Sequence, residues 1–162
     1  MLNISYQYYS SPFGSMLIAS SNEGIIYASF TNTDKELKQL FKEAVFQLKK
    51  EKIHEEALLL FENKNVTVPF HFNGTEFQIK VWKELLKIPY GKLSTYSKVA
   101  KNIKLTSTAS RAVGTAIGDN IIAYFVPCHR VVRNDGTWGE YRWGRELKTK
   151  ILEEETGNKT LF

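Results

Sequence analysis

The sequence contains little of what would cross-link a chain or hold it in a membrane. Cys128 is the single cysteine among 162 residues. One cysteine excludes an internal disulfide and a thiolate-rich zinc site, which is typical of a reducing compartment. The longest apolar run, Ile121 to Val126, is too short to span a bilayer, and Met1 to Tyr9 show no basic leader followed by an apolar stretch. We therefore expect a soluble, cytoplasmic protein in which any chemistry of Cys128 uses a free thiol.

The chain does contain enough apolar residues for a core, together with an excess of basic residues. The hydrophobic content of 43% suits one domain or two small ones, and no internal repeat or low-complexity tract is visible. The formal charge of +5 and the pI near 9.2 favour a polyanionic partner. Charge alone decides little, because many basic proteins bind no polyanion.

The first half of the sequence is typical of a small α+β unit. Three short β-prone runs, Tyr6–Tyr9, Ser15–Ser20 and Gly24–Phe30, are separated by turn-forming residues and predict an antiparallel sheet. Apolar residues at helical spacing predict a helix between residues 34 and 49. A second short helix is expected around residues 55–61.

A break near residues 69–74 separates this unit from the rest of the chain. Thr75 to Gln78 form a capping-box pattern, which predicts a helix running to about Lys87. We therefore expect two domains, residues 1–72 and residues 73–162.

Two further helical patterns follow each other in the second domain. The first pattern has Tyr96, Val99, Ala100 and Ile103 on one stripe, and the second buries Ala109, Ala112, Val113, Ala116 and Ile117. The second pattern leaves an outer face that consists of Ser110, Arg111, Gly114, Thr115 and Gly118. Small residues let a helix approach a phosphate chain or a groove closely, and Arg111 projects from this face. The pair is typical of a helix-turn-helix, although an ordinary helical hairpin gives the same pattern.

Cys128 follows the apolar run Ile121 to Val126 after one residue, Pro127, and we expect this run to form a buried strand. Most lone cysteines are inert core residues. A buried thiol has too high a pKa to attack a substrate, but His129 as a base and Arg130 as a positive charge would lower it. Because adjacent side chains start in different directions, we expect a water molecule to bridge Cys128 and His129. A purely structural role also fits His129.

The last helical pattern offers a partner for His129. Leu147, Ile151 and Leu152 define an apolar face, and Glu155 lies in the middle of that face. A carboxylate that points inward is costly unless it is paired, so a surface role for Glu155 is disfavoured. We expect Glu155 to orient His129.

Residues 74–155, about half of the chain, resemble the O6-alkylguanine-DNA alkyltransferases. The motifs that carry the resemblance are Phe77-Gln78 with Val81-Trp82, Ile88-Pro89-Tyr90-Gly91, Ser110-Arg111-Ala112-Val113-Gly114, Val126-Pro127-Cys128-His129-Arg130-Val131-Val132 and Gly139-Glu140-Tyr141-Arg142-Trp143-Gly144. The N-terminal half resembles the family only through Ser11-Pro12-Phe13-Gly14. The resemblance implies an α+β fold, with a ribonuclease H-like N-terminal sheet domain and a mostly helical C-terminal domain that contains a helix-turn-helix.

The resemblance also implies how the site works. Cys128 takes an alkyl group from O6-alkylguanine in double-stranded DNA, and His129 and Glu155 relay its proton through water. Arg111 fills the space left by the flipped guanine, and Tyr96 helps to rotate the nucleotide and protonates the leaving base. The remaining implied residues are Asn120 as a hinge, Ser110, Gly114 and Thr115 toward DNA, Val131 and Tyr141 in the base pocket, and Arg142 at its lip. Read without the resemblance, Tyr96 fits a core residue and Asn120 fits a turn residue.

Transfer is downhill because a thioether is more stable than an alkoxy-purine, so each molecule should act once. No cofactor is expected, because the damaged base is the alkyl donor, and we expect a monomer. Some relatives hold a structural zinc in the N-terminal domain, but here that half offers only His54 and His71, so we expect no metal.

Some features depart from the family pattern. The helix-turn-helix connection, residues 105–108, is one residue longer than in some relatives. Trp138-Gly139-Glu140 replaces a small, neutral approach to the pocket, which leaves the acceptance of larger alkyl groups open.

Two other functions remain open at this point. A lesion sensor would use the helix-turn-helix without transfer, but family members that only bind lesions lack the cysteine. A cysteine hydrolase would use Cys128, His129 and Glu155 and turn over repeatedly. Adjacent nucleophile and base are rare in such enzymes, and this reading does not explain the outer face around Arg111.

Overall fold

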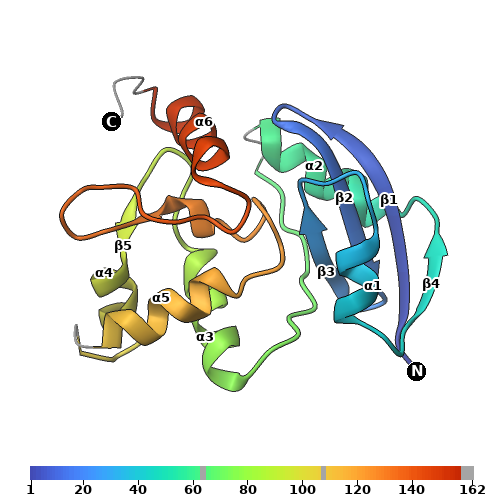
Figure 1. The fold of residues 1–162 in the computed structure, drawn as a ribbon, viewed down its shortest axis with the longest axis horizontal. Helices are drawn as coiled ribbons and strands as arrows, with labels where there is room; N and C mark the ends of the chain where they lie inside the picture. The colour runs from blue at the N-terminus through green and yellow to red at the C-terminus, as the bar shows by residue number, and fades with distance from the viewer. Residues whose placement is uncertain (63–64, 107–108, 158–162) are drawn as a thin grey trace. The chain divides into compact units, whose positions relative to one another are not determined.

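A computed structural model describes residues 1–62, 65–106 and 109–157 (Figure 1). The chain forms two compact units. The first comprises Met1–Asn73 together with Ile121–Phe125, and the second comprises Gly74–Asn120 and the chain from Val126 onward. The first unit therefore includes a short segment from the second half of the sequence. The predicted α+β fold is confirmed.

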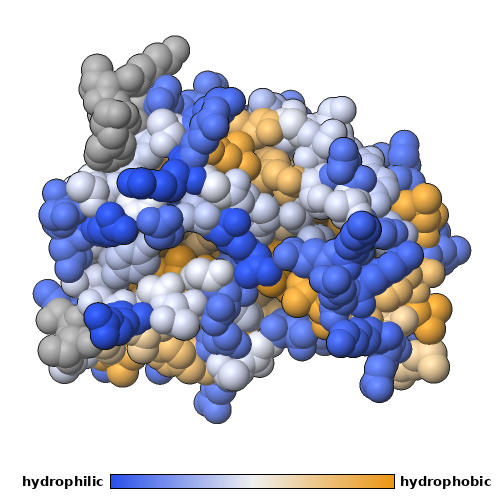
Figure 2. Space-filling view, viewed as in Figure 1, coloured by the Kyte–Doolittle hydropathy of each residue, from blue (hydrophilic) through white to orange (hydrophobic). Residues whose placement is uncertain are grey.

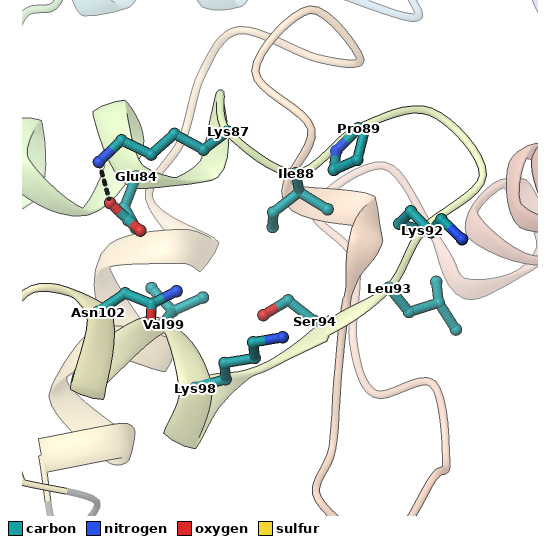
Figure 3. A pocket seen from close by; sticks show the side chains of 10 residues that line it. All are labelled: Glu84, Lys87, Ile88, Pro89, Lys92, Leu93, Ser94, Lys98, Val99 and Asn102. Carbon is teal, nitrogen blue, oxygen red and sulfur yellow. Dashed lines mark ion pairs between the residues drawn. The ribbon is translucent and has the colours of Figure 1, made fainter.

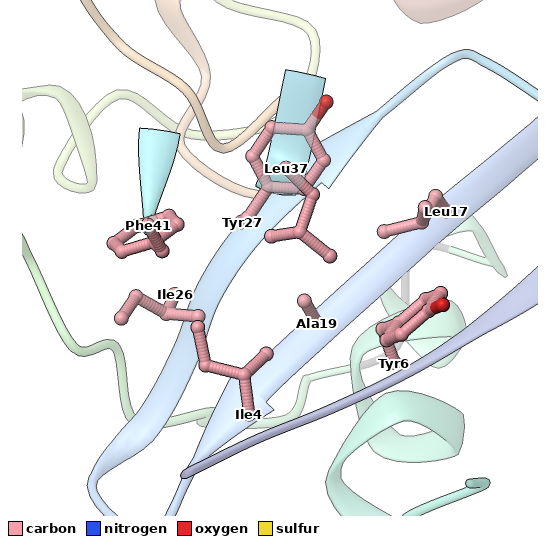
Figure 4. Close-up of a cluster of buried hydrophobic side chains, with 8 residues drawn as sticks. All are labelled: Ile4, Tyr6, Leu17, Ala19, Ile26, Tyr27, Leu37 and Phe41. Carbon is pink, nitrogen blue, oxygen red and sulfur yellow. The ribbon is translucent and has the colours of Figure 1, made fainter. Parts of the chain in front are cut away.

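The first unit is built on a four-stranded sheet with the order β3-β2-β1-β4. Strands β1 (Asn3–Ser11), β2 (Gly14–Ser21) and β3 (Gly24–Ser29) pair antiparallel, as predicted. Buried side chains from these strands point toward one another and toward the helix α1 (Lys35–Leu40) (Figure 4). This cluster consists of Ile4, Tyr6, Leu17, Ala19, Ile26, Tyr27, Leu37 and Phe41.

The single helix predicted between residues 34 and 49 was wrong. Helix α1 ends at Leu40, and Val45–Leu48 form the strand β4, which pairs parallel with β1. Valine and phenylalanine favour extended backbone, and the free edge of β1 supplies partners: Val45 N donates to Leu2 O at 2.8 Å. The apolar residues that suggested a helix do not share a buried face, since Leu40, Val45 and Leu48 are 42%, 47% and 58% exposed.

Helix α2 (Lys52–Leu58) and the 3-10 helix η1 (Leu59–Glu62) occupy the region of the second predicted helix. His54 on α2 is fully buried, and its Nδ1 and Nε2 lie 2.7 Å from the Tyr9 hydroxyl and 2.8 Å from the Ser20 hydroxyl. Burial lowers the pKa of His54 to about 4, so the ring is neutral at physiological pH. Through its two ring nitrogens, His54 connects helix α2 to strands β1 and β2.

The apolar run Ile121 to Val126 was predicted to be a buried strand, and this was wrong. It is buried, but it forms turns with one isolated bridge between Ala28 and Ile122. Ala28 N donates to Ile121 O, and Ala123 N donates to Ala28 O, after which Tyr124 adopts a φ of 68°. The Tyr124 ring stacks on Phe61 at a centroid distance of 4.1 Å. In an extended strand, consecutive side chains would point to opposite faces. The chain turns here because consecutive side chains pack on the same side.

The second unit is mostly helical. Its elements are α3 (Glu76–Leu85), β5 (Ser94–Thr95), α4 (Tyr96–Asn102), α5 (Ser110–Gly118), η3 (Cys128–Arg130), β6 (Val131–Val132) and α6 (Arg145–Thr156). The capping box at Thr75 and Gln78 is present, as predicted. Trp82 on α3 donates from its ring nitrogen to Ala116 O at 2.8 Å, which fixes α3 against α5.

Helices α4 and α5 occupy the positions predicted for the helix-turn-helix. The connection between them includes residues 107 and 108, which lie outside the described residues, so its predicted length is not described. Val113, Ala116 and Ile117 are buried as expected, but Ala112 is exposed. At 100° per residue Ala112 lies at the margin of the stripe centred on Val113, so the buried face is narrower than predicted.

The surface shown in Figure 2 is mainly hydrophilic, with small hydrophobic patches between the charged side chains. In the residues that the structure describes, no helix has the length and apolar character needed to cross a membrane.

A glycine pair in the first unit gives a stability prediction. Gly24 has a φ of +149°, and a Cβ there would lie 2.5 Å from Pro69 O, whereas Gly14 has a φ of +113° with no atom within 4 Å of such a Cβ. Both Gly→Ala substitutions strain the backbone, but only Gly24→Ala also displaces a neighbouring backbone. We expect Gly24→Ala to cost about 1–3 kcal/mol more than Gly14→Ala in urea unfolding. Equal costs would contradict the close approach of Pro69.

Candidate active site

Cys128 begins the 3-10 turn η3 rather than ending a strand, because the preceding run belongs to the turns of the first unit. Its side chain is 5% exposed, and Asn120 Nδ2 lies 3.4 Å from Sγ. The same amide lies 3.4 Å from Val126 O, so Asn120 connects the end of α5 to the chain on both sides of Pro127. Burial raises the pKa of the Cys128 thiol, opposed by the Asn120 hydrogen bond and the charge of Lys148. The resting thiol therefore keeps its proton and needs a base.

His129 and Glu155 form a buried pair. His129 Nε2 lies 2.9 Å from Glu155 Oε2, and both side chains are almost fully inaccessible. The carboxylate comes from the last turn of α6, on the face that also carries the buried Ile151 and Leu152. The side chains of His129 and Glu155, which lie 26 residues apart, thus meet in the interior of the second unit.

Arg130 completes this pair in a way that the sequence reading missed. We expected its charge to act on the thiol, but Nε donates to Glu155 Oε1 at 2.8 Å and an Nη donates to Oε2 at 3.0 Å. Its other Nη donates to Ile88 O at 2.8 Å, and the guanidinium lies 5.8 Å from the Tyr90 ring centroid. The guanidinium therefore compensates Glu155 and ties it to the loop after α3.

The charges of this cluster follow from burial and pairing. Burial alone would raise the pKa of Glu155, but hydrogen bonds from His129 and Arg130 and the positive charge of Arg130 lower it to about 2. Burial lowers the pKa of His129, and Glu155 opposes this effect. Because the Arg130 guanidinium compensates the carboxylate and burial disfavours the imidazolium, Glu155 is ionised and His129 is neutral at rest. The Nε2 proton then faces Glu155, which leaves Nδ1 as the acceptor.

A cavity of about 220 Å³ adjoins the thiol. Its lining residues come from α4, α5, η3 and the loop before α6, and they are Tyr96, Gly114, Ile117, Gly118, Cys128, Glu140, Tyr141 and Arg142. Gly114 lies in this lining, and Gly139 lies close to Tyr96: a Cβ on Gly114 would lie 3.5 Å from the Tyr96 ring, and one on Gly139 would lie 3.2 Å from the Tyr96 hydroxyl oxygen. Val131, in contrast, is fully buried and lies outside the set of lining residues.

Lys148 is a buried residue near the site that sequence reasoning missed. It is 1% exposed, and Nζ donates to Val131 O at 2.9 Å and to Glu140 O at 3.2 Å. Burial lowers its pKa to about 8. Helical spacing contained the signal, because Lys148 precedes Ile151, Leu152 and Glu155 by three, four and seven residues and so shares their face. Its ammonium group holds a wall of the cavity.

The outer face of α5 is accessible. Arg111, Thr115 and Gly118 are exposed, and Ser110 and Gly114 are half-buried. The Thr115 hydroxyl donates to Arg111 O at 3.2 Å within the helix. The described part of the chain holds no group of three or more histidine, cysteine, aspartate or glutamate side chains that could bind a metal ion.

Comparisons with known proteins agree with this arrangement. A family model described as 6-O-methylguanine DNA methyltransferase, DNA binding domain, matches residues 76–157, and one for the ribonuclease-like domain matches residues 4–68. The chain is 38% identical to a methylated-DNA–protein-cysteine methyltransferase of Methanosarcina acetivorans, over 93% of this chain and 97% of that protein. The corresponding protein of Sulfurisphaera tokodaii is 35% identical over 94% of this chain and 93% of its own.

The structure of this chain is similar to a solved crystal structure. The crystal structure of Mycobacterium tuberculosis OGT in complex with DNA matches with a TM-score of 0.80 at 30% identity, covering 94% of this chain and 93% of that one. This chain belongs to the 6-O-methylguanine DNA methyltransferase family. The DNA-binding match of the methyltransferase family contains every candidate site residue from Tyr96 to Glu155, and the ribonuclease-like match contains the four-stranded sheet except Asn3.

The buried ionic cluster predicts a pH-dependent contribution to stability. The pKa of Glu155 is lowered in the folded state, so its contribution is present above about pH 4.5 and is lost as the pH falls toward 2. We expect Glu155→Gln to lower the free energy of unfolding by about 3 kcal/mol at pH 7, and by less than half of that near pH 3. Urea unfolding of both proteins at several pH values measures the difference. A difference that is independent of pH would contradict an ionised, paired Glu155.

Proposed function

We propose that this chain repairs DNA by direct damage reversal, moving the alkyl group of O6-alkylguanine in duplex DNA onto Cys128. The observation that carries the proposal is the position of the thiol: it lines a cavity next to α5 and is followed in the chain by the buried His129–Glu155 pair. Membership of the methyltransferase family supports the same chemistry. The M. tuberculosis neighbour, solved in complex with DNA, supports duplex DNA as the partner.

The proton of Cys128 is the first obstacle. Burial keeps the thiol protonated, and neutral His129 accepts this proton at Nδ1 through a bridging water, while Glu155 stabilises the imidazolium that forms. Arg130 keeps Glu155 ionised throughout. The thiolate then attacks the alkyl carbon, so that an S–C bond forms as the bond between the alkyl carbon and guanine O6 breaks.

The leaving guanine needs a proton in exchange. Burial raises the pKa of Tyr96, so its hydroxyl is protonated at neutral pH. Tyr96 lines the cavity that contains Cys128, and we assign it the roles of helping the nucleotide to rotate and of protonating the base. Asn120 acts as the hinge that holds the thiol, and Tyr141 and Arg142 bind the base. Val131, expected in the base pocket, lies outside the lining of the cavity, and its carbonyl accepts a hydrogen bond from Lys148.

The exposed face of α5 meets the duplex in this proposal. Arg111 enters from the minor groove and replaces the flipped guanine in the base stack. Ser110, Gly114 and Thr115 let the helix approach the DNA backbone.

The reaction ends with a thioether that no residue of the site reverses, so each molecule acts once. Only the damaged base supplies the alkyl group, which requires no cofactor. We further propose a monomer that acts in the cytoplasm, where a single free thiol stays reduced.

The deciding measurement is the intact mass after incubation with a duplex that contains one O6-methylguanine. We expect the mass to increase by one methylene, located on Cys128 by peptide mapping, with repair stopping at one equivalent of DNA. Cys128→Ala is the matched control: it should bind the same duplex and gain no mass. Tight binding of the duplex by wild type without any mass gain would instead establish a lesion sensor, and continued turnover would establish a hydrolase.

Arg111 gives a second test. Arg111→Ala removes the side chain that stabilises the flipped state, which is worth a few kcal/mol. We expect transfer from duplex DNA to slow by about 10- to 100-fold, while transfer from the free base O6-methylguanine keeps its rate. Lys150→Ala, an exposed position on α6, is the control with the same change of charge. If both variants repair duplex DNA at the wild-type rate, Arg111 does not act in flipping.

A further inference from the structure

The positive charge of the protein is concentrated in one segment outside α5. Residues 78–106 contain seven lysines and one glutamate, a formal charge of +6, whereas all other residues together carry −1. The lysines are Lys80, Lys83, Lys87, Lys92, Lys98, Lys101 and Lys104, and all seven are exposed. The net charge of +5 is thus produced by residues 78–106, which include most of α3, the following loop, α4 and Lys104.

The structure arranges six of these lysines, all but Lys101, around a groove. One cavity of about 290 Å³ lies between the end of α3, the following loop and α4 (Figure 3), and a second of about 450 Å³ adjoins it. The two cavities share Glu84, Lys87 and Asn102 in their walls, so they form one depression, which we call the lysine groove. Lysines from both helices and from the loop stand at its rim.

The lysine groove has little negative charge of its own. Glu84 is 8% exposed, and its carboxylate is paired with Lys87 at 2.9 Å. Within the described residues the other six lysines have no ion-pair partner. The walls also offer neutral hydrogen-bonding groups: the Ser94 hydroxyl points into the cavity, and the Asn102 amide lies at its side (Figure 3). Lysine amines together with serine and asparagine side chains are the groups that contact phosphates in protein–DNA interfaces.

We propose that the lysine groove is a second DNA-binding surface, which contacts the phosphate backbone away from the lesion. The backbone comes either from a flanking stretch of the damaged duplex or from a neighbouring duplex, because both present the same phosphodiesters. The inference rests on the proposed DNA substrate but not on methyl transfer. Its contacts are electrostatic and independent of sequence, so they hold the protein on undamaged DNA while α5 searches for lesions.

The test compares two triple variants of the full chain. Lys80→Gln/Lys83→Gln/Lys104→Gln removes three charges from the lysine groove. Lys35→Gln/Lys42→Gln/Lys50→Gln removes three exposed charges from the first unit and is the matched control. Thermal unfolding checks that the wild type and both variants are folded. Affinity for undamaged duplex is then measured against salt concentration.

We expect the groove variant to bind an undamaged duplex of about three helical turns at least tenfold more weakly than the control variant. The slope of log affinity against log salt should shrink by about 2 to 3, because each lost phosphate contact removes about 0.9. If the phosphates come from the flanking part of the same duplex, the differences in affinity and slope between the two variants should vanish on a duplex of about one turn. If the phosphates come from a neighbouring duplex, the groove variant should show an unchanged salt slope when the duplex is dilute. The groove variant bound to an immobilised duplex should then fail to capture a second, free duplex.

Equal slopes and equal capture for the two variants would overturn the proposal. The methylation of Cys128 in wild type is measured separately. If Cys128 gains no methyl group while the slopes differ, the proposed repair reaction fails and the lysine groove stands. The reverse outcome rejects the groove alone.

Discussion

The ionised carboxylate of Glu155 is the interaction on which the site depends. A charge in the interior is costly unless it is compensated, and here it accepts hydrogen bonds from His129 and, on both oxygens, from Arg130. These bonds connect the last turn of α6 with η3, and the guanidinium extends the connection to Ile88 O. Because His129 and Arg130 directly follow Cys128, the same bonds fix the backbone that carries the thiol.

The charged groups around Glu155 have different electrostatic roles. Arg130 compensates Glu155 permanently, so His129 remains neutral and can accept a proton. Lys148, which is buried on the same face of α6, donates to Val131 O and Glu140 O. One helix thus supplies both the carboxylate behind the base and the ammonium group that braces the cavity wall. A thiol that is neutral at rest becomes reactive only when a base accepts its proton. This protects from premature reaction a thiol whose alkylation is not reversed.

The distribution of charge separates two kinds of surface on the second unit. The outer face of α5 carries small residues around one arginine, which suits insertion into DNA. The lysine groove between α3 and α4 has many cations on long, flexible side chains, which suit phosphate contacts that ignore sequence. A single-use protein gains from both, since each molecule must find one lesion among many undamaged base pairs.

Local patterns in the sequence determined much of this protein. Capping residues at Thr75 and Gln78, the periodicity of α4 and α5 and the inward position of Glu155 all follow from the spacing of side chains along one element. The same reasoning failed at residues 45–48, where the free edge of β1 stabilised a strand, and at residues 121–125, where packing in the first unit replaced a strand with turns. Only the tertiary structure decided that Arg130 faces Glu155 instead of Cys128 and that distant lysines share one groove. These outcomes depend on which surfaces meet across the chain, and one-dimensional spacing carries no information about that.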